Sequence, residues 1–139
     1  MFSIPMFSRS ACLLSFILVL LMFPACRPGV DPEDLYGSWK YVKVVSPSAP
    51  AEDLDADLLA AESASISFTR PDSLVIWWGG RKLSRGKFRT EGNLIRYTET
   101  LEGGTTREFP FKVNRLTDRE LVFQTMSEGG TIVTAIREN

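Results

Sequence analysis

From residue 35 to the carboxyl terminus, the chain alternates short runs rich in β-branched and aromatic residues with turn signals. The clearest run is 105–115, where Phe109, Phe111 and Val113 alternate with polar residues and a proline. A period of two places alternate side chains on the same face of a β-strand. This pattern favours an all-β domain built as a meander over parallel strands joined by helices.

The sequence predicts eight strands in this region, at residues 38–45, 65–69, 73–78, 82–89, 94–101, 105–115, 120–127 and 131–137. After the second strand, every connection has the length of a hairpin, and several contain paired glycines. Successive strands should therefore pair antiparallel, and eight of them can close into a ring without exposed edges. We predict an eight-stranded antiparallel up-and-down barrel at residues 35–139, with a two-sheet β-sandwich as the alternative.

One connection, at residues 46–64, is much longer than the others. Leu54 and Leu58 lie four residues apart in it, which predicts a short helix after the first strand, with acids in its first turn. Asp53, Asp55 and Asp57 alternate there, but the glycine and the bidentate glutamate of a calcium loop are missing. We interpret these acids as a solvated helix start and predict no metal site.

The first 25 residues have the layout of a signal peptide. A short polar stretch with Arg9 precedes an apolar run of 13 residues, 11–23. As a helix this run would measure about 20 Å, which is short for a hydrocarbon core of about 30 Å. The junction Phe23-Pro24-Ala25-Cys26 resembles the lipobox of bacterial lipoproteins, in the relaxed form found in Bacteroidetes. The resemblance implies cleavage before Cys26 and acylation of its sulfur.

Cysteine usage agrees with this interpretation. Cys12 lies in the leader, so Cys26 would have no intrachain partner in an oxidising envelope. Acyl chains such as palmitate on Cys26 would anchor the protein to a membrane of the bacterial cell envelope. We expect this membrane to be the outer membrane. The sequence leaves open whether the protein faces the periplasm or the cell surface. Residues 26–34 contain two prolines, one glycine and three acids, which predicts a flexible tether.

The amino-acid composition argues against several classes of function. The chain has no histidine, so it lacks the usual neutral-pH general base and the commonest nitrogen ligand for zinc. We therefore expect neither an enzyme nor a bound cofactor. The net charge is -1 and becomes -2 when Arg9 leaves with the leader, so nucleic acid is not an expected partner. The basic stretch 81–89 is interpreted as the solvated face of a strand whose Phe88 points inward.

Three short motifs span the predicted domain: Gly37-Ser38-Trp39 on the first strand, Thr117-Asp118 in the sixth turn, and Arg137 on the last strand. They resemble motifs of the lipocalins, and residues 116–122 resemble a stretch of the lipocalin-like domains found on small Bacteroidetes lipoproteins. The resemblance implies that Trp39 closes the base of the barrel. It also implies that Arg137 lies across the Trp39 ring in a cation–π contact.

Aromatic residues on the inward faces are candidates for lining a ligand pocket: Tyr41, Trp78, Tyr97, Phe109, Phe111 and Phe123. Such side chains can also simply fill an eight-stranded barrel. The leading hypothesis is a membrane-tethered module whose barrel binds a small apolar or amphipathic ligand, or a peptide. The alternative is a non-enzymatic interaction or structural protein with a filled barrel. It would bind an envelope protein through an outer surface near Trp77 and the acidic residues of 51–62.

Overall fold

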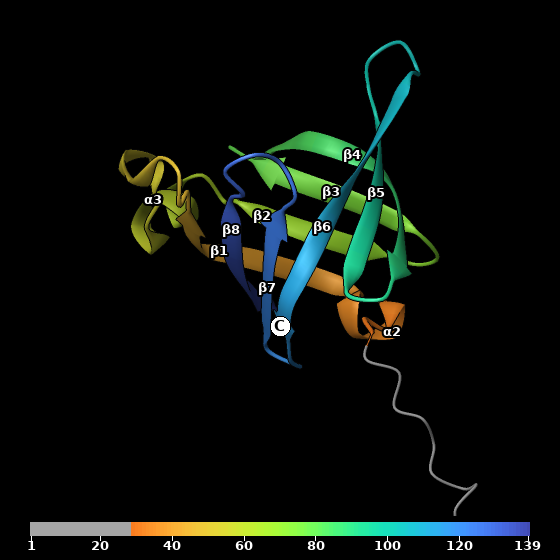
Figure 1. Ribbon diagram of the computed structural model, residues 1–139, viewed down its shortest axis with the longest axis horizontal. Helices are drawn as coiled ribbons and strands as arrows, with labels where there is room; N and C mark the ends of the chain where they lie inside the picture. The colour runs from red at the N-terminus through yellow and green to blue at the C-terminus, as the bar shows by residue number, and fades with distance from the viewer. Residues whose placement is uncertain (1–28) are drawn as a thin grey trace, which may run out of the picture.

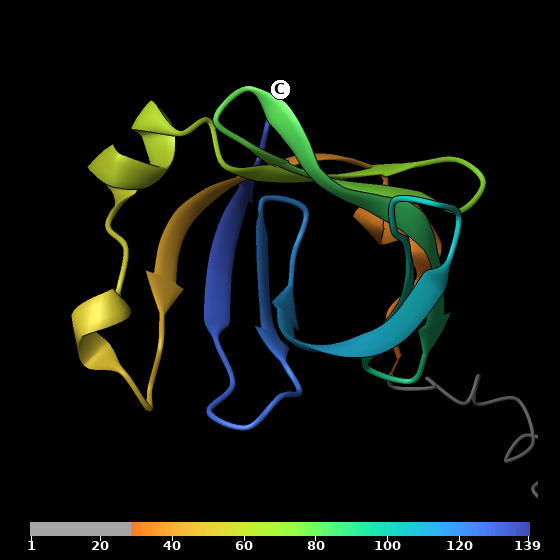
Figure 2. The same cartoon turned by 90° about the horizontal axis from the view of Figure 1, so that it is seen from above.

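In the computed structural model, which describes residues 29–139, the chain forms a closed barrel of eight strands. The strands are β1 (Gly37–Val45), β2 (Ser65–Thr69), β3 (Ser73–Trp78), β4 (Arg81–Glu91), β5 (Leu94–Thr100), β6 (Thr106–Leu116), β7 (Glu120–Thr125) and β8 (Ile132–Arg137). Each strand pairs antiparallel with the next, and β8 pairs with β1 (Figure 1, Figure 2). The predicted barrel is confirmed. The sandwich is wrong, because one ring of pairings joins all eight strands.

The predicted signal peptide, residues 1–25, and the predicted lipidation residue, Cys26, lie outside the described residues. Among residues 29–139, no helix has the length and the apolar character needed to span a membrane. The buried hydrophobic residues of this stretch run from Leu35 to Ala135 and form one cluster. Residues 29–139 therefore contain a complete ring of strands and a core of their own.

The alternating strand directions gather the connections at two ends of the barrel. One end, which we call the base, holds α2 (Pro32–Leu35), the turns at 70–72, 92–93 and 117–119, and the carboxyl terminus. The other, which we call the open end, holds the connection 46–64 and the turns at 79–80, 101–105 and 126–131. In Figure 1, α2 lies below the barrel and the cyan corner between β5 and β6 extends above it.

The long connection contains a 3-10 turn, η2 (Pro50–Glu52), and the predicted short helix, α3 (Ala56–Ala61). Asp55 caps α3, since its carboxylate accepts a hydrogen bond of 3.0 Å from the Leu58 amide. Leu54 pairs through its backbone with Val44 of β1. The buried residue of α3 is Leu59, whereas Leu58 is 46% exposed. The prediction that Leu54 and Leu58 pack on one apolar face is therefore wrong at Leu58. A helix as short as α3 directs one leucine, Leu59, toward the core.

The register shift of β4 occurs at Leu83. Ile76 pairs with Ser84 and Trp77 pairs with Lys82, so Leu83 is the extra residue of a β-bulge and is 65% exposed. Gly86, three residues further along β4, lies in regular register with Leu74 and Glu99. A Cβ atom on Gly86 would overlap the carbonyl oxygen of Thr98, so glycine permits the close approach of β4 and β5.

Residues 30–34 belong to the barrel domain and not to a flexible tether. The amide of Val30 donates to the Gly92 carbonyl at 2.8 Å, and Asp31 caps α2 by accepting a hydrogen bond from Glu33. Arg70 forms an ion pair of 2.6 Å with Glu33. The tether prediction is wrong for this segment, because these contacts and the burial of the neighbouring Leu35 fix it against the base.

The base is closed by Trp39 and Arg137. The Trp39 ring is fully buried, and its Nε1 donates to the Leu35 carbonyl at 2.8 Å. The Arg137 guanidinium carbon lies 4.1 Å from the centroid of this ring, as the resemblance implies. Its three nitrogens donate to the carbonyls of Tyr36, Asp34 and Asp118 at 2.7, 2.7 and 2.8 Å. One side chain therefore joins α2, the β6–β7 turn and the last strand.

Arg137→Ala should lower the free energy of unfolding by about 2–3 kcal/mol, because three charge-assisted hydrogen bonds and a cation–π contact are lost. Urea denaturation followed by tryptophan fluorescence measures the change. Arg115→Ala is the matched control, since Arg115 forms an exposed ion pair of 3.0 Å with Glu120. We expect the control to stay within about 0.5 kcal/mol of the parent protein. Equal losses in the two variants would contradict the role of Arg137.

Candidate functional site

Five of the six predicted pocket residues form one aromatic cluster inside the barrel, the lumen cluster: Tyr41, Tyr97, Phe109, Phe111 and Phe123. Ring centroids lie 6.2 Å apart for Tyr41 and Phe123, 5.2 Å for Phe123 and Phe111, and 5.9 Å for Phe111 and Tyr97. Tyr41 on β1 and Tyr97 on β5 come from opposite walls of the ring. Contacting rings therefore bridge the lumen and fill its middle.

The sixth predicted residue, Trp78, stands apart from these rings at the end of β3. It is half-buried and packs against the hydrophobic core near the open end. Its neighbour Trp77 is also half-buried, and the Lys82 ammonium lies 5.6 Å from the centroid of the Trp77 ring. The connection 46–64 pairs with β1 through Leu54 and meets the end of β3 at Gly79.

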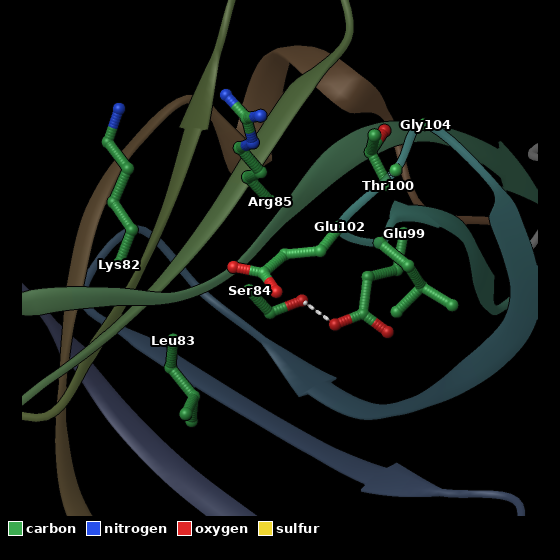
Figure 3. A pocket seen from close by; sticks show the side chains of 10 residues that line it. Lys82, Leu83, Ser84, Arg85, Glu99, Thr100, Glu102 and Gly104 are labelled. Carbon is green, nitrogen blue, oxygen red and sulfur yellow. Dashed lines mark hydrogen bonds between the residues drawn. The ribbon is translucent and has the colours of Figure 1, made fainter.

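A hollow of about 750 Å³, the mouth pocket, lies at the open end between β4 and the corner that joins β5 to β6. It is lined by residues of two short segments: Lys82, Leu83, Ser84 and Arg85, and Glu99, Thr100, Leu101, Glu102, Gly103 and Gly104 (Figure 3). None of the six predicted aromatic residues lines it. The lumen cluster lies below the pocket, since Tyr97 precedes Glu99 by two residues on the same inward face.

Ser84, Tyr97 and Glu99 form a hydrogen-bonded chain at the floor of the mouth pocket. Ser84 Oγ lies 2.6 Å from the Tyr97 hydroxyl and donates to Glu99 Oε1 at 2.6 Å. Glu99 is 7% exposed, and among residues 29–139 it is the one polar or charged residue that is buried. Burying a carboxylate carries a large desolvation cost unless hydrogen bonds or an opposite charge offset it, so such a group marks a candidate site.

Arg107 supplies the opposite charge from the neighbouring strand. Glu99 and Arg107 are register partners on β5 and β6, and Arg107 Nε donates to Glu99 Oε2 at 2.5 Å. The Arg107 side chain is 62% exposed while that of Glu99 is 10% exposed, so the guanidinium covers the carboxylate from the solvent side. The Arg107 guanidinium carbon also lies 5.7 Å from the centroid of the Phe109 ring.

Burial is the main influence on the pKa of the two tyrosines of the lumen cluster, Tyr41 and Tyr97. It raises the pKa of the Tyr41 hydroxyl, and the nearby Tyr97 raises it further. Burial also raises the pKa of Tyr97, helped by the Glu99 carboxylate, while the hydrogen bond with Ser84 and the charge of Arg107 oppose this shift. Both hydroxyls are therefore protonated at neutral pH.

Ser84 and Glu99 were not predicted as site residues, although one signal for Glu99 is present in the sequence. Ile95, Tyr97 and Glu99 share one parity on a predicted strand, so an acid follows two apolar residues on the inward face. Ser84 gave no such signal, because the bulge at Leu83 sets its direction. The sequence also gave no sign that Arg107 and Glu99 are register partners across the β5–β6 corner.

The other candidate features have structural explanations. Arg85, Lys87 and Arg89 are exposed on one face of β4, and Phe88 is buried on the other, as expected. Arg89 pairs with Glu108 at 3.2 Å. Within residues 29–139, no group of three or more potential metal-ligating residues is assembled.

Comparison with known proteins shows the fold alone. No protein-family model matches the chain, and no curated protein matches it. A crystal structure at 2.60 Å resolution of an uncharacterized protein from Bacteroides eggerthii DSM 20697 has a similar fold, with a TM-score of 0.53. The two proteins are 18% identical, and the matched region covers 75% of this chain and 99% of the other.

The raised pKa of Tyr41 predicts a loss of stability in alkali. An unfolded tyrosine ionises near pH 10, whereas the folded barrel retains the proton to higher pH, so the unfolded state gains stability above about pH 10. The contribution of Tyr41 is thus fully present below pH 10 and is lost as pH rises toward its folded pKa. Tyr41→Phe should flatten the fall in unfolding free energy between about pH 10 and 11.5, measured by urea titrations. Parallel curves for the two proteins would contradict the shift.

Proposed function

We propose that this chain is a lipid-anchored, lipocalin-like binding protein of the bacterial envelope, not an enzyme, and that it takes a small amphipathic ligand in the mouth pocket. One observation carries the proposal: a hollow of about 750 Å³ at the open end has a buried carboxylate at its floor. Its volume lies in the range of small-molecule sites, roughly 300–1,000 Å³. The similar barrel from Bacteroides eggerthii and the Trp39–Arg137 contact support the lipocalin-like assignment.

The composition of the pocket favours an amphipathic ligand over a purely apolar one. Leu83 and Leu101 offer apolar surface on two sides, while Ser84 and Glu99 offer polar atoms at the floor. The lumen cluster fills the barrel below, so a ligand would be held at the mouth and not along the axis. A short apolar group with one polar end fits this arrangement.

The position of Gly29 indicates where the proposed lipid anchor on Cys26 would lie relative to the mouth pocket. Gly29 and Val30 lie beside Gly92 at the base, opposite the open end. Gly29 lies three residue steps after Cys26, a distance of at most about 11 Å at roughly 3.3–3.6 Å per residue. Acylation of Cys26 would therefore hold the base close to the membrane and direct the mouth pocket away from it.

Binding at the mouth is tested with the fluorescent apolar probe N-phenyl-1-naphthylamine. Leu83→Asn should raise its Kd by about fivefold to tenfold, since roughly 50 Å² of buried apolar contact at about 25 cal/mol per Å² is lost. Leu58→Asn is the matched control, because Leu58 is also an exposed leucine but lies on α3, outside the mouth pocket. The control should leave the Kd unchanged. Equal weakening in both variants, or none in either, would count against this pocket.

The anchor is tested by growing cells with an alkyne analogue of palmitate and following label on the protein. Cys26→Ala should lose the label and leave the detergent phase, whereas Cys12→Ala should keep both properties because Cys12 lies in the predicted leader. Mass spectrometry of the amino-terminal peptide locates the acyl groups. Label that survives in Cys26→Ala would refute the anchoring residue.

A further inference from the structure

The hydrogen-bond inventory of the mouth pocket restricts the kind of polar group that it can receive. The single Ser84 proton is donated to Glu99, because a carboxylate that forms an ion pair with an arginine only accepts. Ser84 Oγ can therefore only accept in its contact with Tyr97, whose hydroxyl must be the donor. Both hydroxyl protons are used within the chain. The free hydrogen-bonding capacity at the floor is then the unused lone pairs of Glu99, which need a donor.

The charged side chains around the pocket point to the same conclusion. In Figure 3 the Glu102 carboxylate extends toward Ser84, so it lies on the same side as the carboxylate of Glu99. Lys82 and Arg85 line the rim, but their side chains extend away from these acids. Lys82 instead lies near the Trp77 ring on the outer face. The inner wall of the pocket is therefore acidic.

Arg107 already supplies a cationic partner for Glu99, although it is not among the residues that line the mouth pocket. Its guanidinium bonds to Glu99 from the solvent side, and its side chain is 62% exposed. Glu99, by contrast, is held by burial and by Ser84. Between these partners the exposed arginine is the one that can move away, and a ligand cation that replaces its hydrogen bond would keep the buried carboxylate paired.

We infer that the mouth pocket selects a ligand whose polar end is a hydrogen-bond-donating cation, an ammonium or guanidinium, and that Arg107 stands in for this cation until the ligand displaces it. The inference rests on the proposed binding function and adds the chemical class of the ligand. The cation would contact Glu99 at the floor, and a short apolar chain would lie against Leu83 and Leu101. The protein would then discriminate by charge, because an anion of the same shape would meet Glu99 and Glu102.

The test uses three probes with the same alkyl chain and different head groups: decylammonium, decanol and decanoate. At neutral pH the two ions are kept below their micellar concentrations and decanol is kept below its solubility limit. Residues 29–139 are used after circular dichroism and urea denaturation have confirmed a cooperative β fold. Isothermal titration calorimetry gives each Kd. Decylammonium should bind at least about tenfold more tightly than decanol, as expected for a charge-assisted hydrogen bond, and decanoate should bind most weakly.

Two substitutions should change the affinity for decylammonium in opposite directions. Glu99→Gln should weaken it about tenfold or more while leaving decanol unchanged, because it removes the charge and keeps the shape. Arg107→Ala should strengthen it about threefold to tenfold, because the ligand no longer competes with the guanidinium. Arg107→Lys retains a cation at the mouth and is the matched control, with an affinity near that of the parent.

The outcomes separate this inference from the proposed function. Equal binding of the three probes, tighter binding of decanoate, or weaker decylammonium binding in Arg107→Ala would overturn the inference and leave an amphiphile-binding barrel. If none of the probes binds, both the inference and the proposed function are overturned. Because Arg107 is exposed, its variants keep the test decisive even if Glu99→Gln does not fold.

Discussion

The pairing of the first strand with the last is the constraint on which the rest of this structure depends. It turns a meander into a ring, and Arg137 secures the junction by joining the Trp39 ring to three backbone carbonyls at the base. A closed ring fixes which side chains face each other across the lumen. The contact of the aromatic rings, and the position of Glu99 above them, follow from that closure.

Much of the fold was available from the sequence, because its determinants are local. Period-two alternation in 105–115 reflects a backbone geometry that repeats within each strand, and paired glycines mark hairpin corners. These two signals were sufficient for the number, order and pairing of the strands. The inward direction of Phe109 and Phe111 followed in the same way, whereas the short helix within 46–64 was predicted from the spacing of Leu54 and Leu58.

The mouth pocket could not be predicted, because it depends on register and on one bulge. The bulge at Leu83 determines that Ser84 points inward, and no local sequence pattern indicates this bulge. Glu99 and Arg107 meet because the β5–β6 corner sets their register. The tether prediction was wrong at 30–34 for a related reason. Prolines and acids favour an extended chain, but Glu33 forms an ion pair with Arg70, on a turn that is distant in the sequence.

The corner between β5 and β6 extends beyond the rest of the barrel (Figure 1), and residues 102–108 are exposed throughout. The core therefore places few demands on the length or composition of this corner, while part of the mouth pocket belongs to it. Related barrels could exchange the corner and acquire new ligand preferences without rebuilding their interiors. Selection for recognition and selection for foldability would then act on separate stretches of one small chain.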